Sequence, residues 1–535
     1  MHFGDISPAL SFSHRNVSKL SAFAVRDRQS YKRIDTANMT LGKRGKTIVH
    51  RFYYKHDQLA ERAALQPHFD HTASRSGNLL YDQNKFVQIR MFIESLRVVA
   101  QPGSDKNGLS SFQALMVSTA SRVGTGNIAG ISTAICLGGS GAVFWMWLTA
   151  ILGSASAFIE STLAQIYKHK AKDGSSYGGP AYYIQAALKK RWIGVLFAVV
   201  LILTYMGGFN LVASFNIADS FRVYSFFNPE WTPLIVGAIL AVVFALAVFG
   251  GSKKISQITE VLVPVMGIFY LAVSLFIILK HYQLVPVMFT SIFNNAFDVQ
   301  AIFGGFAGSC VMHGIKRGLF SNEAGVGSAP NAAASAAVSH PVKQGLVQML
   351  SVFIDTILIC SATAFMLLCS GVEPTSKLAG MPWVQAAASS SLGGFGTIFI
   401  TIALCLFAFT TLIGNFYYAE MGLKFLCGRK PPKAVINTFR IIAAAIVLAG
   451  ATMEFSIVWN TADVLMGLMA LINLPVILIL CKPAIQAMND YTKQKKAGKD
   501  PVFKAADIQL KDKTDFFGIK EKTGTVDLTF PVFEY

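Results

Sequence analysis

Small and polar residues interrupt a long apolar segment between Ser118 and Gly130, where the sequence reads STASRVGTGNIAG. A helix at membrane depth normally satisfies its backbone N–H and C=O groups internally, and irregular backbone persists there only where it lines a cavity or is buried in protein. Gly124 and Gly126 favour local unwinding at this point. Freed carbonyls would then coordinate a cation and freed N–H groups would bind a carboxylate, which is typical of discontinuous helices in secondary transporters.

Two other interpretations of this segment are open. Residues 124–129 also fit the pattern GxGxxA of dinucleotide-binding turns, which requires a preceding strand and a soluble βαβ unit. The flanking residues are instead apolar over a membrane-spanning length, which argues against that pattern. The second alternative is a glycine motif that packs two membrane helices together.

Two adjacent hydroxyl side chains, Thr410 and Thr411, lie in the middle of another apolar segment. Hydroxyls in such helices commonly donate to a carbonyl of their own helix one turn earlier, and this structural interpretation stays open. Hard cations prefer oxygen ligands, and a hydroxyl pair supplies two of them. The pair is therefore a candidate cation site.

Ionisable side chains inside apolar segments are costly and are functional candidates by default. They are Arg122, Glu160, Asp355, Glu420 and Asp463. One interpretation is charge neutralisation, with Glu160 or Asp355 as the partner of Arg122, and the other is a direct role in ion coupling or gating. Further polar residues would line an inner vestibule or cap a helix end, namely Gln165, Asn322 and Glu323.

The composition indicates an integral membrane protein. Of the 535 residues, 53% are hydrophobic and 14% are charged, whereas soluble proteins carry about 25% charged residues. The seven cysteines are scattered without metal-ligand spacing, which favours buried apolar roles. Ten segments reach the length needed to span a bilayer, namely 110–135, 141–168, 193–220, 233–250, 256–281, 297–316, 342–370, 393–426, 432–452 and 457–481.

The net charge of +18 comes from short connections and from the two tails, which argues against nucleic-acid binding. Basic residues gather in alternate connections, among them Lys316, Arg317 and Lys343 after the sixth segment. The positive-inside rule therefore places the start of the first segment and the end of the last in the cytoplasm.

The chain divides into four parts. Residues 1–84 are basic and polar, with no apolar run that would span a membrane or act as a signal peptide. An interfacial amphipathic helix is expected within 85–108. Residues 109–481 form the transmembrane core, and residues 482–535 form a Lys-rich cytoplasmic tail.

A second glycine-rich break, residues 304–309, lies in the sixth spanning segment, at the position that matches the first break in the other half. Paired breaks of this kind predict an inverted repeat with a site between its halves. The predicted fold class is thus an all-α polytopic membrane protein, a five-plus-five inverted-repeat helix bundle with two broken helices. Phe306, inside the second break, is a candidate gate or pocket wall, with a packed aromatic as the alternative.

From Leu109 to about Asp490 the chain resembles the alanine/glycine:cation symporter family, the sodium:alanine symporters. The resemblance is carried by ASRVGTGNIAG (120–130), GAVFWMW (141–147), GGPAYYI (178–184), KRGLFSNEAGVGSAPNAAA (316–334), HPVKQGLVQM (340–349) and FIDT (353–356). It implies a leucine-transporter-like fold with one extra helix before the ten. The chain departs from that pattern, because residues 50–84 are too polar to span.

The resemblance also implies a site. The N–H groups of Thr125 and Gly126 would hold a substrate carboxylate, and the carbonyls of Ala120 and Val123 would face Na⁺ together with Thr410 and Thr411. The implied substrate-binding set is Thr125, Gly126, Asn127, Phe306, Thr411 and Asn415. Many family members carry Trp at the position of Asn415, so a larger or more polar pocket is expected, which adds glutamine to alanine and glycine.

The expected function is sodium-coupled import of a small neutral amino acid by alternating access, across a bacterial inner membrane. The expected partners are the amino acid, Na⁺ as coupling ion and the lipid bilayer. No catalytic constellation is recognisable, so an enzyme is not expected. The alternative is a channel or a transport-inactive amino-acid sensor with the same fold, and the sequence leaves sodium against proton coupling open.

Overall fold

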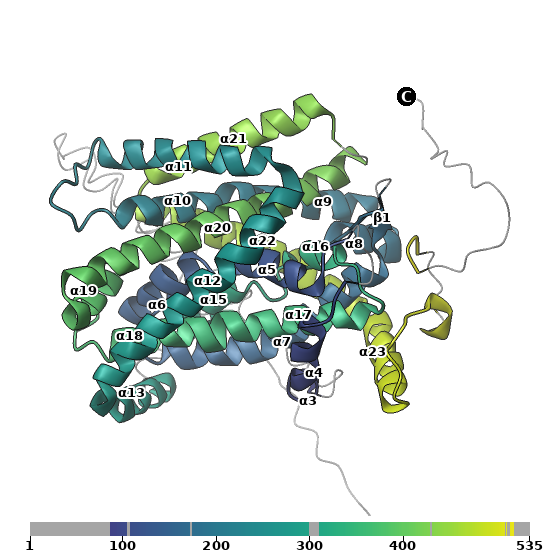
Figure 1. Ribbon diagram of the computed structural model, residues 1–535, viewed down its shortest axis with the longest axis horizontal. Helices are drawn as coiled ribbons and strands as arrows, with labels where there is room; N and C mark the ends of the chain where they lie inside the picture. The colour runs from purple at the N-terminus through teal and green to yellow at the C-terminus, as the bar shows by residue number, and fades with distance from the viewer. Residues whose placement is uncertain are drawn as a thin grey trace, which may run out of the picture. The chain divides into compact units, whose positions relative to one another are not determined.

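The computed structural model describes residues 86–103, 108–171, 174–298, 310–428, 431–508, 510 and 514–517. Within these residues the chain is almost entirely helical (Figure 1), and the only strands are β1 (His169–Lys170) and β2 (Ser176–Tyr177), an antiparallel pair. Eight helical segments are long and apolar enough to cross a membrane, namely Ala142–Ile166, Arg191–Asp219, Thr232–Phe249, Lys253–Lys280, Pro341–Leu368, Gly394–Cys427, Lys433–Ala451 and Phe455–Ile479. The prediction of an all-α polytopic membrane protein is confirmed.

The first predicted spanning segment is a broken helix. It consists of α5 (Ser111–Arg122), the π-helical η1 (Gly126–Gly130) and α6 (Ile131–Gly138). Two further segments contain π-helical turns, η2 (Leu203–Phe209) between α9 (Arg191–Ile202) and α10 (Asn210–Asp219), and η4 (Phe353–Cys360) between α17 (Pro341–Val352) and α18 (Ser361–Leu368). Such turns are rare and concentrate at functional sites.

The prediction for the sixth segment, residues 297–316, is wrong in its extent. Helix α13 (Val285–Phe297) begins earlier, and α15 (Cys310–Asn322) continues to Asn322. Lys316 and Arg317 therefore lie inside a helix rather than in a basic connection. The physical reason is pairing, because Asp463 on α22 (Phe455–Ile479) lies 2.7 Å from Lys316 Nζ and 2.8 Å from Arg317 Nη2. The second break, 304–309, lies outside the described residues, and the inverted repeat stays a prediction.

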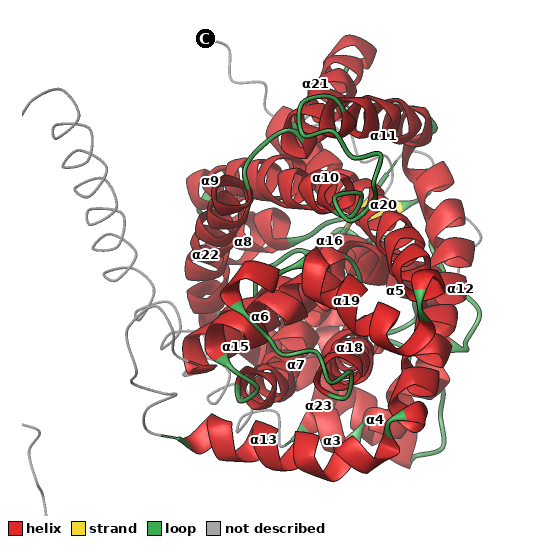
Figure 2. Cartoon of the chain, turned by 90° about the vertical axis from the view of Figure 1, so that its left-hand side faces the viewer, coloured by secondary structure: helices red, strands yellow, loops and turns green. Residues whose placement is uncertain are grey.

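Burial separates central helices from peripheral ones. The central helices are α7 (Ala142–Ile166), α9–α10, α17–α18 and α20 (Gly394–Cys427). In their most apolar 18-residue stretches, 61–67% of the residues are buried. In α11 (Thr232–Phe249), α12 (Gly251–Lys280) and α21 (Lys433–Ala451) the share is 28%. Figures 1 and 2 show α11 and α21 at one edge of the bundle and α13 at the opposite edge. The central group positions the site, and the peripheral helices expose apolar side chains suited to lipid.

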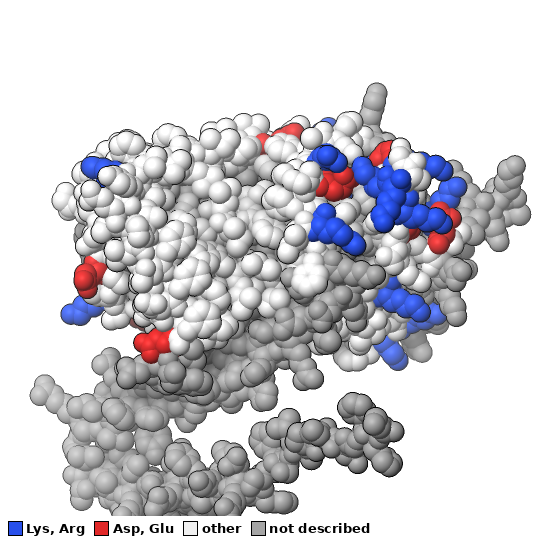
Figure 3. Space-filling model, turned by 90° about the horizontal axis from the view of Figure 1, so that it is seen from below, with Lys and Arg blue, Asp and Glu red and all other residues white. Residues whose placement is uncertain are grey.

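The charged side chains mark one end of the bundle. In Figure 3 most of the visible Lys and Arg side chains gather at one end. In Figure 1 the same end carries α8 (Pro180–Leu188) and α23 (Cys481–Lys496). This is the end that the positive-inside rule predicts to be cytoplasmic.

The segment before the core forms two short helices, α3 (Val87–Arg90) and α4 (Phe92–Val99). Ile89, Ile93 and Leu96 are exposed, whereas Val98 is buried. An exposed apolar face suits the predicted interfacial position, which stays a prediction. Residues 1–84 lie outside the described residues.

Candidate functional site: a buried pocket at the helix break

The break in the first spanning segment lies between α5 and η1. Helix α5 ends at Arg122, and Val123 leaves the helical conformation with φ −77° and ψ 88°. The side chain of Asn127 closes the gap, because its Oδ1 accepts a hydrogen bond from the N–H of Gly124 at 2.8 Å. The unwinding predicted for this segment is therefore present, and the Asn127 side chain stabilises it.

Glycines let two other helices reach the unwound backbone. A Cβ on Gly124 would lie 2.0 Å from Oγ1 of Thr411, and one on Gly126 would lie 3.1 Å from the ring of Phe320. On the opposing helix α20, a Cβ on Gly414 would lie 2.8 Å from the backbone nitrogen of Ser121. Close packing of α15 and α20 against the break thus depends on residues without side chains.

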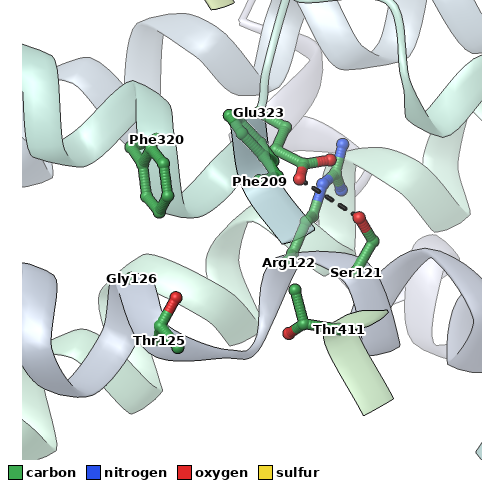
Figure 4. A pocket seen from close by; sticks show the side chains of 8 residues that line it. All are labelled: Ser121, Arg122, Thr125, Gly126, Phe209, Phe320, Glu323 and Thr411. Atoms are coloured by element: carbon green, nitrogen blue, oxygen red, sulfur yellow. Dashed lines mark hydrogen bonds between the residues drawn. The ribbon is translucent and has the colours of Figure 1, made fainter. Parts of the chain in front are cut away.

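A small pocket lies against this break. Figure 4 shows Phe209, Phe320 and Glu323 on one side of it, and Thr125 and Thr411 on the other. All of its lining residues are buried from solvent, namely Ser121, Arg122, Thr125, Gly126, Phe209, Phe320, Glu323 and Thr411. The pocket is therefore secluded inside the bundle, with polar groups on both sides and two aromatic rings.

Oxygen atoms from α5 and α20 gather beside the pocket. Oγ1 of Thr411 donates to the carbonyl of Ala120 at 3.2 Å and to that of Phe407 at 3.0 Å. Oγ1 of Thr410 donates to the same Phe407 carbonyl at 2.8 Å. Both hydroxyls therefore bond back to their own helix, as the structural interpretation of this pair predicts, and Thr411 also reaches the end of α5. The cation site stays a prediction.

Asn127 lies away from the pocket. Its Nδ2 donates to Oδ1 of Asp355 at 2.7 Å, while Oδ2 of Asp355 accepts from the hydroxyls of Ser321 and Thr356, each at 2.8 Å. Asp355 is fully buried. Its carboxylate thus ties the break to η4 and to α15, and Asn127 acts here as a link between elements.

Asn415 does not line the pocket either. Its Oδ1 accepts from the hydroxyl of Ser121 at 2.7 Å, and its Nδ2 donates to Oδ1 of Asn210 at 3.0 Å. The Ser121 hydroxyl also lies 3.2 Å from Oε1 of Glu323. Asn415 is therefore one layer behind the pocket wall, whereas Phe306 lies outside the described residues.

The expected ion pair of Arg122 is absent from the described part of the chain. Its Nη1 donates to the hydroxyl of Ser351 and to the carbonyl of Gln348 at 3.5 Å. Glu160 instead accepts from Nδ2 of Asn473 at 2.8 Å. Neutral donors therefore satisfy Glu160 and Asp355 within the described residues.

Several pocket residues were not predicted by sequence reasoning. Phe320 belongs to the motif KRGLFSNEAG, which was the available signal, and Phe209 carried none, whereas Glu323 was predicted to line an inner vestibule or cap a helix end. The rings of Phe209 and Phe320 lie 4.7 Å apart, and Trp459 lies 4.9 Å from Phe320. The guanidinium of Arg317 lies 4.3 Å from the Trp459 ring. These side chains form one connected cluster, of which Phe209 and Phe320 line the pocket.

A family model described as the sodium:alanine symporter family matches residues 76–505. The chain belongs to the sodium:alanine symporter family. It is 45% identical over 424 residues to the amino-acid carrier protein AlsT of Bacillus subtilis, covering 79% of this chain and 89% of that protein. It is 46% identical to the probable sodium/glutamine symporter GlnT of Bacillus subtilis, covering 78% and 86%.

A third relative is the sodium/alanine symporter AgcS of Methanococcus maripaludis, 38% identical over 74% of this chain and 87% of that protein. Among solved structures, a mutant manganese transporter of Eremococcus coleocola has a TM-score of 0.46 at 12% identity, covering 73% of this chain and 81% of its own, too low a likeness to argue from. As a member of the sodium:alanine symporter family, the protein is a multi-pass membrane transporter, a cation-coupled amino-acid symporter and not an enzyme.

Proposed function

We propose that this symporter carries a small neutral amino acid together with Na⁺ across a bacterial inner membrane, by alternating access. Alanine and glycine are the proposed substrates, with glutamine as the next candidate. The observation that carries the proposal is the contact of Thr411 with the carbonyl of Ala120, which brings oxygen atoms of two helices to the edge of the buried pocket.

The proposed Na⁺ site comprises the carbonyls of Ala120, Val123 and Phe407 with the hydroxyls of Thr410 and Thr411. In the described geometry these hydroxyls donate to carbonyls. A hydroxyl has two lone pairs and a rotatable proton. Rotation would therefore turn the oxygen of each threonine toward a cation while the carbonyls give up a hydrogen bond for a metal contact.

The proposed amino-acid site uses both polar sides of the pocket. The N–H groups of Thr125 and Gly126 lie at the start of the helical segment η1–α6, where backbone donors and the helix dipole favour a carboxylate. Glu323 provides a carboxylate for the substrate ammonium group. The rings of Phe209 and Phe320 would face the side chain of the amino acid, and the small size of the pocket favours alanine and glycine once it widens to admit a substrate.

The seclusion of the pocket supports a carrier that alternates between two sides. The rings of Phe209 and Phe320 line the pocket, Trp459 packs on Phe320, and Arg317, which pairs with Asp463, packs on Trp459. A carrier needs such a closed state between its two open ones, whereas an open channel does not. Binding of ion and substrate at one site would make each raise the affinity for the other.

The test is transport by the purified protein in liposomes, with labelled alanine, glycine and glutamine. We expect accumulation above equilibrium under an inward Na⁺ gradient, and no accumulation when K⁺ replaces Na⁺. Equal uptake in both salts, with accumulation under a proton gradient alone, would contradict sodium coupling.

Counterflow separates the carrier from the alternatives. Liposomes that contain a carrier and are preloaded with unlabelled alanine accumulate labelled alanine transiently. Each outward movement of unlabelled alanine leaves the binding site facing the outside, where it binds labelled alanine. A channel or a transport-inactive sensor does not do this. Absence of counterflow in liposomes that contain folded protein would favour those alternatives.

A further inference from the structure

The chain after the last spanning helix folds back along the basic end of the bundle. Helix α22 ends at Ile479, and α23 (Cys481–Lys496) follows almost directly. We define the C-terminal strap as residues 490–508 and 514–517, which include the short helix η6 (Ala505–Ile508). In Figure 1 α23 lies at the same end of the bundle as α4 and one end of α17.

The strap is bonded to the loop that precedes α17, residues 335–340. The N–H of Phe503 donates to the carbonyl of Ser339 at 3.0 Å, and the hydroxyl of Ser339 donates to the carbonyl of Pro501 at 2.8 Å. Next to the loop, Nζ of Lys343 lies 3.0 Å from Oδ1 of Asp500. Backbone and side-chain contacts therefore fix the strap in one register against the loop.

His340 is the central contact of this attachment. Its ring is fully buried between those of Tyr491 and Phe503, at 5.1 and 5.2 Å, in edge-to-face geometry. Its Nε2 lies 3.2 Å from Oδ2 of Asp490. The strap thus supplies the whole aromatic surrounding described for this loop histidine.

Two further contacts extend the strap across the end of the bundle. Nζ of Lys168, just after α7, lies 3.9 Å from the centre of the Phe516 ring, and His169 pairs with Asp515. Lys168 also donates to the carbonyl of Ala336 at 3.0 Å. The strap, the end of α7 and the loop are therefore joined at one place.

The same loop is joined to the start of the broken helix. The N–H of Leu109 donates to the carbonyl of Ser335 at 3.2 Å, and the N–H of Ala337 donates to that of Leu109 at 2.8 Å. Helix α5 begins two residues later, at Ser111, and its other end carries Ala120. The loop is therefore hydrogen-bonded to the strap on one side and to the start of α5 on the other.

We propose that the C-terminal strap is a latch at the inner end of the bundle, which holds the loop 335–340 and through it the start of α5 until the strap loosens. The inference rests on the proposed alternating access, because only a carrier needs the inner end of α5 to move. Two of the strap's three ion pairs to the loop and its surroundings use exposed carboxylates, with Asp500 70% and Asp515 58% exposed, and only Asp490 at His340 is largely covered.

The test compares neighbouring strap residues in the full-length protein. Phe503→Ala removes the ring packed on His340, and Val502→Ala is its control, because Val502 is exposed. Asp500→Asn removes the partner of Lys343, and Asp507→Asn is its control, because Asp507 is exposed and has no ion pair in the described structure. Uptake of labelled alanine is measured in intact cells as a function of the external Na⁺ concentration. The rate of efflux is measured in cells preloaded with labelled alanine.

A loosened latch shifts the population toward the inward-open state. The fraction of protein with an outward-facing site falls, and the apparent affinity for external Na⁺ falls in proportion. We expect half-saturating external Na⁺ to rise about threefold or more in F503A, to rise less in D500N, and efflux to accelerate in both, while the controls match the unchanged protein.

Equal Na⁺ dependence and efflux in F503A, D500N and their controls, at equal folded yield, would overturn the latch. If F503A lowers the folded yield, D500N decides, because it changes one exposed carboxylate. Failure of the proposed function is distinguishable, since the unchanged protein would then show no Na⁺-dependent uptake at all.

Discussion

The hydroxyl of Thr411 lies 3.2 Å from the carbonyl oxygen of Ala120, although 291 positions separate them in the sequence. Gly124 permits this contact, because any side chain there would collide with Thr411. The unwound segment and α20 therefore meet at this point, and under the proposed function substitutions on either side are expected to affect the same ion.

Replacing Thr411 with Val removes one proposed Na⁺ ligand at constant volume. We expect half-saturating Na⁺ to rise at least tenfold when Thr410 is replaced as well, which corresponds to about 1.4 kcal/mol of binding free energy. Thr397→Val on the same helix is the control, because Thr397 is partly exposed. Unchanged sodium dependence in the double variant would remove both threonines from the site.

Replacing Gly414 with Ala places a Cβ 2.8 Å from the backbone nitrogen of Ser121, which has no flexible end to move aside. We expect a loss of about 1–3 kcal/mol of unfolding free energy, the usual cost of overpacking, together with impaired uptake. The control is Gly467→Ala on α22, where a Cβ meets nothing within 4 Å. Thermal unfolding in detergent compares the stability of the two variants. Equal melting temperatures would show that α20 moves away from Ser121 at no cost in stability.

Asn127 and Asp355 are expected to act as one unit. Asn127→Ala removes the donor to Oδ1 of Asp355, and Asp355→Asn replaces an acceptor that three groups address. Each change leaves buried polar groups unpaired, at a cost of about 1–3 kcal/mol. The double variant should lose less than the sum of the single losses in unfolding free energy, and strict additivity would argue that the contact is unimportant.

The family pattern implies that Asn415→Trp would make the pocket smaller, whereas the structure predicts a loss of stability. Asn415 bridges Ser121 and Asn210 behind the pocket wall. An indole there would overpack a fully buried position and destabilise the protein by about 1–3 kcal/mol. We expect lower folded yield with the same rank order of competing amino acids. A folded variant that excludes glutamine and retains alanine would instead place Asn415 in the pocket.

His340, in the loop before α17, is expected to make the stability of the protein depend on pH. Burial lowers the pKa of His340 to about 4, against the opposing effect of Asp490 and with a smaller lowering by Lys343. The neutral ring fits its contacts, because Nδ1 accepts from the N–H of Val342 at 3.2 Å while Nε2–H is directed at Asp490.

A pKa lowered on folding makes the native state the weaker proton binder, so its stability is present above about pH 6.5 and is lost as the pH falls toward 4. We expect the melting temperature to decline over this range. His340→Asn, which cannot titrate, should flatten the decline between pH 6.5 and 5. A decline of the same size in that variant would assign the effect to other groups.

The sequence by itself determined the class of the molecule and most of its spanning helices. Long apolar runs, sparse charge and the glycine break at Gly124 are properties of contiguous residues, and they specify membrane depth and local unwinding without knowledge of distant neighbours. The motifs around Arg122 and Phe320 likewise identified the family. Lys316 and Arg317 led to a wrong end for the sixth predicted segment. Charged residues usually mark the end of a spanning helix, and the sequence does not show that these two pair with Asp463.

Only the tertiary structure decided which atoms meet. The rotation of each helix about its axis, set by packing against distant segments, brings Thr411 to Ala120 and turns Asn127 toward Asp355. It also places Asn415 behind the pocket wall and brings to the proposed Na⁺ site the carbonyl of Phe407, a backbone atom that no residue type reveals. Local chemistry thus defines the break, whereas the partners that turn it into a site depend on long-range packing.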